Sequence, residues 1–105
     1  MDAIVQADLL EELKGKLQIT WTDEDNDFKK MILKSEAYLS NLTGASFDFV
    51  RELEPKEILL ERCRYVYNNT ADQFEVNYRH ELGRLILNVA LGKVGVIDGT
   101  TSGDV

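Results

Sequence analysis

The residues best suited to bind a divalent cation lie in the stretch TWTDEDNDF, residues 20–28. Four carboxylates fall within five positions there, Asp23, Glu24, Asp25 and Asp27. Alternating acids open the calcium loop of EF-hand proteins, but that loop also needs a glycine at its sixth position and a glutamate at its twelfth. Counted from Asp23, these positions hold Phe28 and Lys34. An aromatic side chain and an ammonium group do not fit those roles, so we predict no metal site here.

The same stretch fits the start of a helix. Thr22 can act as N-cap, because its hydroxyl accepts a hydrogen bond from a free backbone N–H of the first turn. Carboxylates in that turn are favoured by the positive end of the helix dipole. Apolar or small residues then recur at steps of three or four: Phe28, Ile32, Ser35, Leu39 and Leu42. Gly44 suits the left-handed conformation that ends many helices. We predict a helix over residues 23–42.

A nucleophile and a base could come only from Cys63 and His80, the single members of their kinds. A helical hairpin turning near Asn69 would bring them within about one turn of each other. However, Cys63 lies on the apolar side of its predicted helix, and no third residue stands out to orient a base. The chain also lacks a glycine-rich phosphate loop and metal-ligand spacings such as C-x-x-C. We predict no enzyme activity, no cofactor and no metal.

Apolar periodicity places four helices along the chain. The helices are expected over residues 7–17, 23–42, 55–67 and 72–91, with Pro55 in the first position of the third. The segment between the second and third lacks a helical period, and its Phe47 and Phe49 alternate as in a short extended piece. The predicted fold is all-α, a small antiparallel bundle of three to four helices over residues 1–92. Residues 93–105, rich in Gly, Thr, Ser and Asp, are expected to form a flexible C-terminal tail.

The last predicted helix is apolar around most of its circumference, because it contains LILNVAL at residues 85–91. A helix of this kind must be covered on all sides. The cover is either the first helix or a neighbouring subunit, and the pattern alone leaves both open. Gly83, on the flank of this helix, is expected to allow a close helix approach.

Bulk composition narrows the class of protein. The chain has 105 residues, a formal net charge of −7 and one cysteine. An acidic balance argues against an extensive grip on nucleic-acid phosphates. The single cysteine excludes an intrachain disulfide and fits a reducing cytosol. No run approaches the roughly 18 apolar residues of a membrane span, and the N-terminus does not resemble a signal peptide. We expect no association with membranes.

Two stretches together resemble the head–tail connector (adaptor, or head-completion) proteins of long-tailed bacteriophages. They are DEDNDFKKMILKSEAYLSNLTG at residues 23–44 and RCRYVYNNTADQFEVNYRHELGRLILNVALG at residues 62–92. The shared pattern is an acidic helix start leading to Y-L-x-x-L-T-G, followed by a helical hairpin with R-Y-x-Y-N-x-x-x-x-F-E-x-N-Y across its turn. With the linking segment, the resemblance covers roughly residues 8–92.

The resemblance implies a non-enzymatic virion protein at the head–tail junction, present in the host cytoplasm during assembly. Identical subunits would form a homo-oligomeric ring under the portal protein, extend the DNA channel and bind a downstream head-completion or tail protein. DNA would be cargo passing through the channel. By analogy the arm 93–105 would bind the portal through Val94, Val96 and Ile97. The expected subunit interface contains Tyr78, Leu87, Ala90 and Leu91.

A second hypothesis belongs to another class. A small acidic protein without enzyme activity can regulate or inhibit a host factor, for instance by imitating the charge of DNA. Such a mimic should concentrate its carboxylates on one exposed face. In this chain they cluster at predicted helix starts and alternate with Lys and Arg, which favours the connector.

Overall fold

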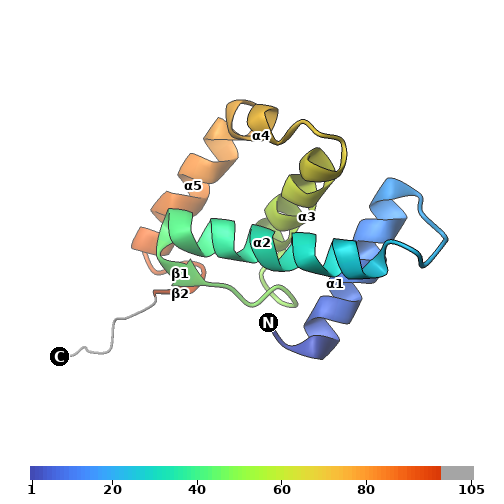
Figure 1. The fold of residues 1–105 in the computed structure, drawn as a ribbon. Coiled ribbons are helices and arrows are strands. Elements are labelled where there is room, and N and C mark those ends of the chain that lie inside the picture. Colours follow the sequence, from blue (N-terminus) through green and yellow to red (C-terminus); the bar gives the residue numbers. More distant parts are fainter. Residues whose placement is uncertain (98–105) are drawn as a thin grey trace.

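Helices make up most of the chain in the computed structural model, which describes residues 1–97 (Figure 1). Within these residues there are five helices and two short strands: α1 (Ala3–Leu17), α2 (Asp25–Thr43), β1 (Ala45–Ser46), α3 (Leu53–Tyr67), α4 (Ala71–Asn77), α5 (Arg79–Ala90) and β2 (Val96–Ile97). The predicted helical fold class is confirmed. The predicted number of three to four helices is too low, and the two strands were not expected as a pair.

The starts of the first two helices differ from the predictions. Helix α1 begins at Ala3 rather than residue 7, because the Asp2 carboxylate accepts a hydrogen bond from the backbone N–H of Ile4 at 2.7 Å and caps it. Helix α2 begins at Asp25, and Thr22 is not its cap. The carbonyl of Thr22, not its hydroxyl, accepts from the Asp25 N–H at 3.2 Å. The predicted end is confirmed, since Gly44 closes α2 with φ of 73°.

Helix α2 packs against α1, α3 and α5, and Figure 1 shows it running across α3 and α5 rather than alongside them. Helices α3 and α5 run in opposite directions and are joined at one end by α4. Only this pair therefore matches the antiparallel arrangement that we predicted. The side chains that fill the core between these helices include Leu9, Leu13, Phe28, Ile32, Leu39, Leu59, Cys63, Phe74 and Leu85.

The predicted fourth helix, 72–91, is two helices that meet at Tyr78. This residue has φ of −108° and separates α4 from α5. The ring of Tyr78 stacks on Phe74, with centroids 5.0 Å apart, and packs edge-on against Tyr65 at 5.8 Å. Kinks usually come with proline or glycine, and residues 75–82 contain neither. The sequence therefore gave no signal for the break.

The chain after α5 folds back onto the body of the protein. Strand β2 pairs antiparallel with β1, Ala45 opposite Ile97 and Ser46 opposite Val96. Gly95 makes the return possible, because it adopts φ of 71°, a conformation that L side chains rarely take. The prediction of a flexible tail from residue 93 is therefore wrong for residues 93–97. The remainder of that predicted arm, 98–105, lies outside the described residues.

Candidate functional site

The C-terminal half of α5 presents an apolar, uncovered side away from the core. Leu82, Leu85 and Val89 face the core, whereas Leu87 is 56% exposed and Leu91, just beyond the helix, is 59% exposed. Ala90 is exposed beside them, and so is Ile86, which sequence reasoning did not single out. Neither α1 nor any other described segment covers this side. We call Ile86, Leu87, Ala90 and Leu91 the α5 stripe.

Tyr78, predicted to join the same subunit interface, lies elsewhere. Its ring is half-buried among aromatic side chains of the subunit itself. Its hydroxyl donates a hydrogen bond to Glu61 of α3 at 2.8 Å. The structure thus brings Leu87, Ala90 and Leu91 together and places Tyr78 between α3 and α5.

The three residues expected to anchor the C-terminal arm point in different directions. Val94 is half-buried and packs against the core. Val96 is 71% exposed and Ile97 is 42% exposed. The backbone that carries them is held in place, because the N–H of Gly95 donates to the Glu52 carboxylate at 2.7 Å. Two apolar side chains are therefore presented to solvent on a fixed strand rather than on a loose tail.

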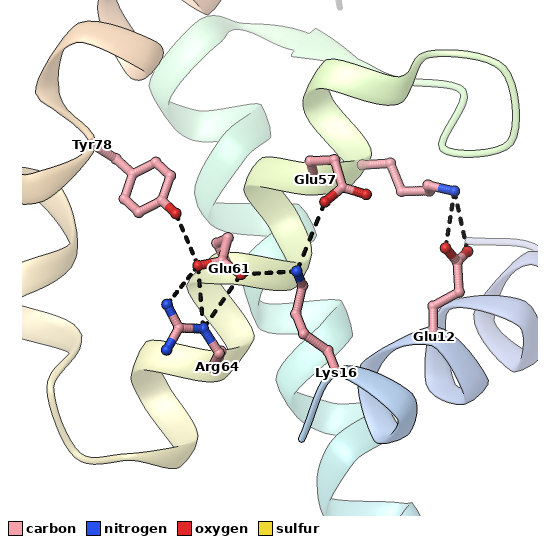
Figure 2. A network of polar contacts seen from close by, with 7 residues as sticks. Glu12, Lys16, Glu57, Glu61, Arg64 and Tyr78 are labelled. Carbon is pink, nitrogen blue, oxygen red and sulfur yellow. Dashed lines mark hydrogen bonds and ion pairs between the residues drawn. The ribbon is translucent and has the colours of Figure 1, made fainter. Parts of the chain in front are cut away.

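A network of charged side chains joins α1, α3 and the α4–α5 junction (Figure 2). Its centre is Glu61 of α3, which accepts a hydrogen bond from Arg64 at 2.7 Å and one from Tyr78 at 2.8 Å. The ammonium of Lys16, from α1, lies 3.0 Å from Glu61 and 3.8 Å from Glu57. Two other segments, α1 and the α4–α5 junction, are thus tied to a single carboxylate of α3.

The pKa of Glu61 reflects this position. Burial alone would raise it, but the hydrogen bonds from Arg64, Lys16 and Tyr78 together outweigh burial and lower the pKa to about 2. Burial, together with the hydrogen bond to Glu61, raises the pKa of Tyr78 to about 12. Glu61 is therefore ionised at neutral pH and fully engaged, which is the state of a structural carboxylate rather than of a general acid.

A groove runs between α3 and α5 next to this network. Its lining combines apolar and charged side chains: Lys16, Leu53, Glu54, Glu57, Ile58, Glu61, Tyr78, Glu81 and Arg84. We call it the α3–α5 groove. Sequence reasoning missed it, although the recurrence of Glu54, Glu57 and Glu61 at helical spacing was visible as a charged stripe on one helix.

The residues considered for catalysis are not assembled into a pair. The thiol of Cys63 is buried and donates to the Ser35 hydroxyl of α2 at 3.4 Å. Burial raises its pKa to about 11, although Ser35 and Arg62 act in the opposite direction. His80 is exposed on α5. A protonated, buried thiol is a poor nucleophile, so this geometry offers no activated cysteine.

Two of the four carboxylates in the acidic stretch 20–28 make side-chain contacts within the chain. The carboxylate of Asp25 pairs with Lys14 at 2.8 Å, and that of Glu24 accepts from the Trp21 indole at 2.9 Å. Among residues 1–97, no group of three or more His, Cys, Asp or Glu side chains is placed to hold a metal ion. No helix in this part of the chain is both long and apolar enough to cross a membrane.

Comparison with models of protein families, with curated proteins and with solved structures finds no match to this chain.

Proposed function

We propose that this chain is a structural subunit of the head–tail junction of a long-tailed bacteriophage. Copies of it form a ring under the portal protein, extend the DNA channel and offer a platform to a downstream head-completion or tail protein. DNA passes through as cargo. The protein works in the virion and is present in the host cytoplasm during assembly. It performs no reaction.

The observation that carries the proposal is the α5 stripe. Four neighbouring apolar residues face solvent at the C-terminal end of α5, with Leu87 and Leu91 more than half exposed. Continuous apolar surface on a small protein commonly marks a contact with another protein. Exposed Val96 and Ile97 add a second apolar feature on β2. The resemblance to connector proteins supplies the identity of the neighbours, a second copy and the portal.

The acidic regulatory protein is the less favoured alternative. An imitation of DNA needs carboxylates that are free and gathered on one face. Here several are neutralised by partners in the same chain: Glu54 by Arg84 at 2.8 Å, Glu12 by Lys56 at 3.0 Å and Asp25 by Lys14 at 2.8 Å.

The experiment is to mix the chain with the portal assembly of the same phage and to follow both by size-exclusion chromatography with light scattering. We expect a complex that contains several copies of the chain per portal. Because residues 93–97 belong to the fold, the portal-binding prediction is tested with Val96→Asp rather than by deleting 93–105. This variant keeps the fold and loses portal binding. The absence of any complex for the wild-type chain contradicts the proposed function.

A further inference from the structure

The α3–α5 groove opens on the face of the subunit opposite α2. Glu54, Glu57 and Glu61 recur at steps of three or four, which places them on one side of α3. Cys63, which meets Ser35 of α2, lies on the other side. Figure 2 agrees, because α2 passes behind α3 when the charged network faces the viewer. The groove and α2 therefore occupy two opposite faces.

The groove has an apolar floor and a rim on which the glutamates outnumber the basic residues. Leu53, 62% exposed, and the buried Ile58 contribute to the floor. Both basic side chains of the rim already form ion pairs within the chain, since Arg84 pairs with Glu54 and Lys16 with Glu61. Glu57 keeps 58% of its side chain exposed and has only a 3.8 Å contact with Lys16.

Glu81 lies on the α5 side of the same rim. It is half-buried and makes no hydrogen bond or ion pair with any described residue. The groove is thus shaped for an apolar side chain flanked by positive charge.

The outer face of α2 has the complementary pattern. Leu33 is 43% exposed, and Lys30 and Lys34 are exposed next to it, both on the same side of it around the helix. Lys30 and Leu33 lie on the side of α2 away from the core. Lys34 lies on the flank toward α3, where it lines a hollow with Ser35 and Arg62. Within residues 1–97, neither lysine has an ion-pair partner. In a chain with a formal net charge of −7, two unpaired lysines next to an exposed leucine are a distinct feature.

We propose that the outer face of α2 in one subunit docks into the α3–α5 groove of the next subunit. Leu33 enters over Leu53 and Ile58, and Lys30 and Lys34 lie opposite Glu57 and Glu81. The inference deepens the proposed function and rests on it, because it assigns two further faces, besides the α5 stripe, through which neighbouring ring subunits meet. The contact joins two different faces, so it repeats head to tail and closes into a ring or continues as a stack.

A second copy is the occupant that the charges favour. The groove needs a cationic and apolar surface, and the same chain presents one on its opposite face. Opposite potentials on the two faces attract, whereas two grooves or two α2 faces repel each other. A two-fold dimer through either face is therefore disfavoured, and a head-to-tail contact is selected.

The test uses charge reversal on each face. Lys30→Glu/Lys34→Glu makes both faces acidic, and Glu57→Lys/Glu81→Lys makes both faces basic. By sedimentation velocity, each variant alone should self-associate at least about tenfold more weakly than the wild type. An equimolar mixture should regain association, because each groove then meets an α2 face of opposite charge. The variant with all four changes should also regain it.

Controls of equal charge lie away from both faces. Arg51→Glu/Lys93→Glu matches the first variant and Asp8→Lys/Glu11→Lys matches the second, all at exposed positions. These controls should associate like the wild type. Unchanged melting temperatures of all variants at high dilution show that each one folds.

Three results overturn the inference: wild-type-like association of both reversed variants, a mixture that stays dissociated, or a wild-type chain that is monomeric at about 1 mM, where even a weak contact is populated. The first of these outcomes points to a different occupant of the groove. Portal binding is scored separately with Val96→Asp. Failure of the head-to-tail contact and failure of the connector function are thus distinguishable.

Discussion

The carboxylate of Glu52 accepts a hydrogen bond from the backbone N–H of Gly95 at 2.7 Å, although 43 positions separate the two residues. Its other oxygen accepts from the backbone N–H of Asp48 at 2.8 Å. One side chain therefore fixes both the loop before α3 and the strand after α5. Because of this link, the C-terminal segment up to Ile97 belongs to the folded domain.

Gly95→Ala should loosen this segment. The residue has φ of +71°, and a Cβ there would lie 2.9 Å from Cε1 of Phe47 and 3.1 Å from the carbonyl oxygen of Ser46. Strain and crowding together should cost about 1–3 kcal/mol, mostly as opening of the β1–β2 pair. Hydrogen exchange at the β1–β2 backbone measures it. Gly92→Ala is the control, because it has φ of +73° but nothing within 4 Å. An equal increase in hydrogen exchange for both variants would contradict the proposed crowding at Gly95.

Gly83→Ala should stabilise the protein by about 0.5–1 kcal/mol, since alanine restricts the unfolded chain and favours helix. A Cβ at this exposed position of α5 meets nothing within 4 Å, so the close helix approach that we expected there is wrong. Thermal or urea unfolding gives the change in free energy. Gly15→Ala in α1, equally uncrowded, should behave in the same way. A loss of stability in both variants would show that these glycines have a role in the fold that their surroundings do not reveal.

Removal of the charge at Glu61 should destabilise the fold more than any other single change in its network. Glu61→Gln leaves Lys16 and Arg64 without their main acceptor and should cost about 1–3 kcal/mol. Tyr78→Phe removes one hydrogen bond and should cost about 1 kcal/mol. A double-mutant cycle in urea tests their coupling. Strict additivity would refute the shared network.

The contribution of Glu61 should vanish in acid. Its pKa is lowered from 4.5 to about 2, which means that the ionised carboxylate is more stable in the folded protein than in the unfolded chain. The stability that it adds is fully present above pH 4.5 and is lost as the pH falls toward 2. The difference in unfolding free energy between wild type and Glu61→Gln should be flat near neutrality and shrink across that window. A difference that persists at the acid end would mean that shape, not charge, is responsible.

Polar substitution in the α5 stripe should separate assembly from folding. Leu87→Ser/Leu91→Ser changes side chains that are 56% and 59% exposed, so the isolated subunit should lose no more than about 0.5 kcal/mol per site. Leu85→Ala, at a fully buried position of the same helix, should cost about 2–5 kcal/mol. Light scattering in the presence of the portal should show fewer bound copies for the double variant. Unimpaired assembly would remove the stripe from the interface.

Periodicity predicted the helical fold because the burial of an apolar face determines where a helix can form. It located the ends at Gly44 and Tyr67 and the exposed positions Leu87 and Leu91. It could not locate the break at Tyr78, because that break depends on aromatic packing with Phe74 and Tyr65 and on a hydrogen bond to Glu61. These contacts come from tertiary structure, which a local pattern does not contain.

The same limit explains the C-terminal segment and the groove. Glycine, serine and threonine after residue 92 are typical of a tail, but Gly95 also permits the return turn that joins β2 to β1. The segment folds back rather than staying loose because Glu52, which is distant in the sequence, accepts a hydrogen bond from the Gly95 N–H. The groove likewise needs Lys16, Glu57 and Glu81 from three different helices, and no spacing rule links them.

Subunit dimensions of 49 × 31 × 18 Å describe a slab scarcely two helix diameters thick. A slab this thin has little interior relative to its surface, and apolar side chains such as Leu87 and Leu91 are exposed in the single subunit. In the proposed assembly, each added copy acts as a ligand for the native state of its neighbour, so the melting temperature should rise with protein concentration.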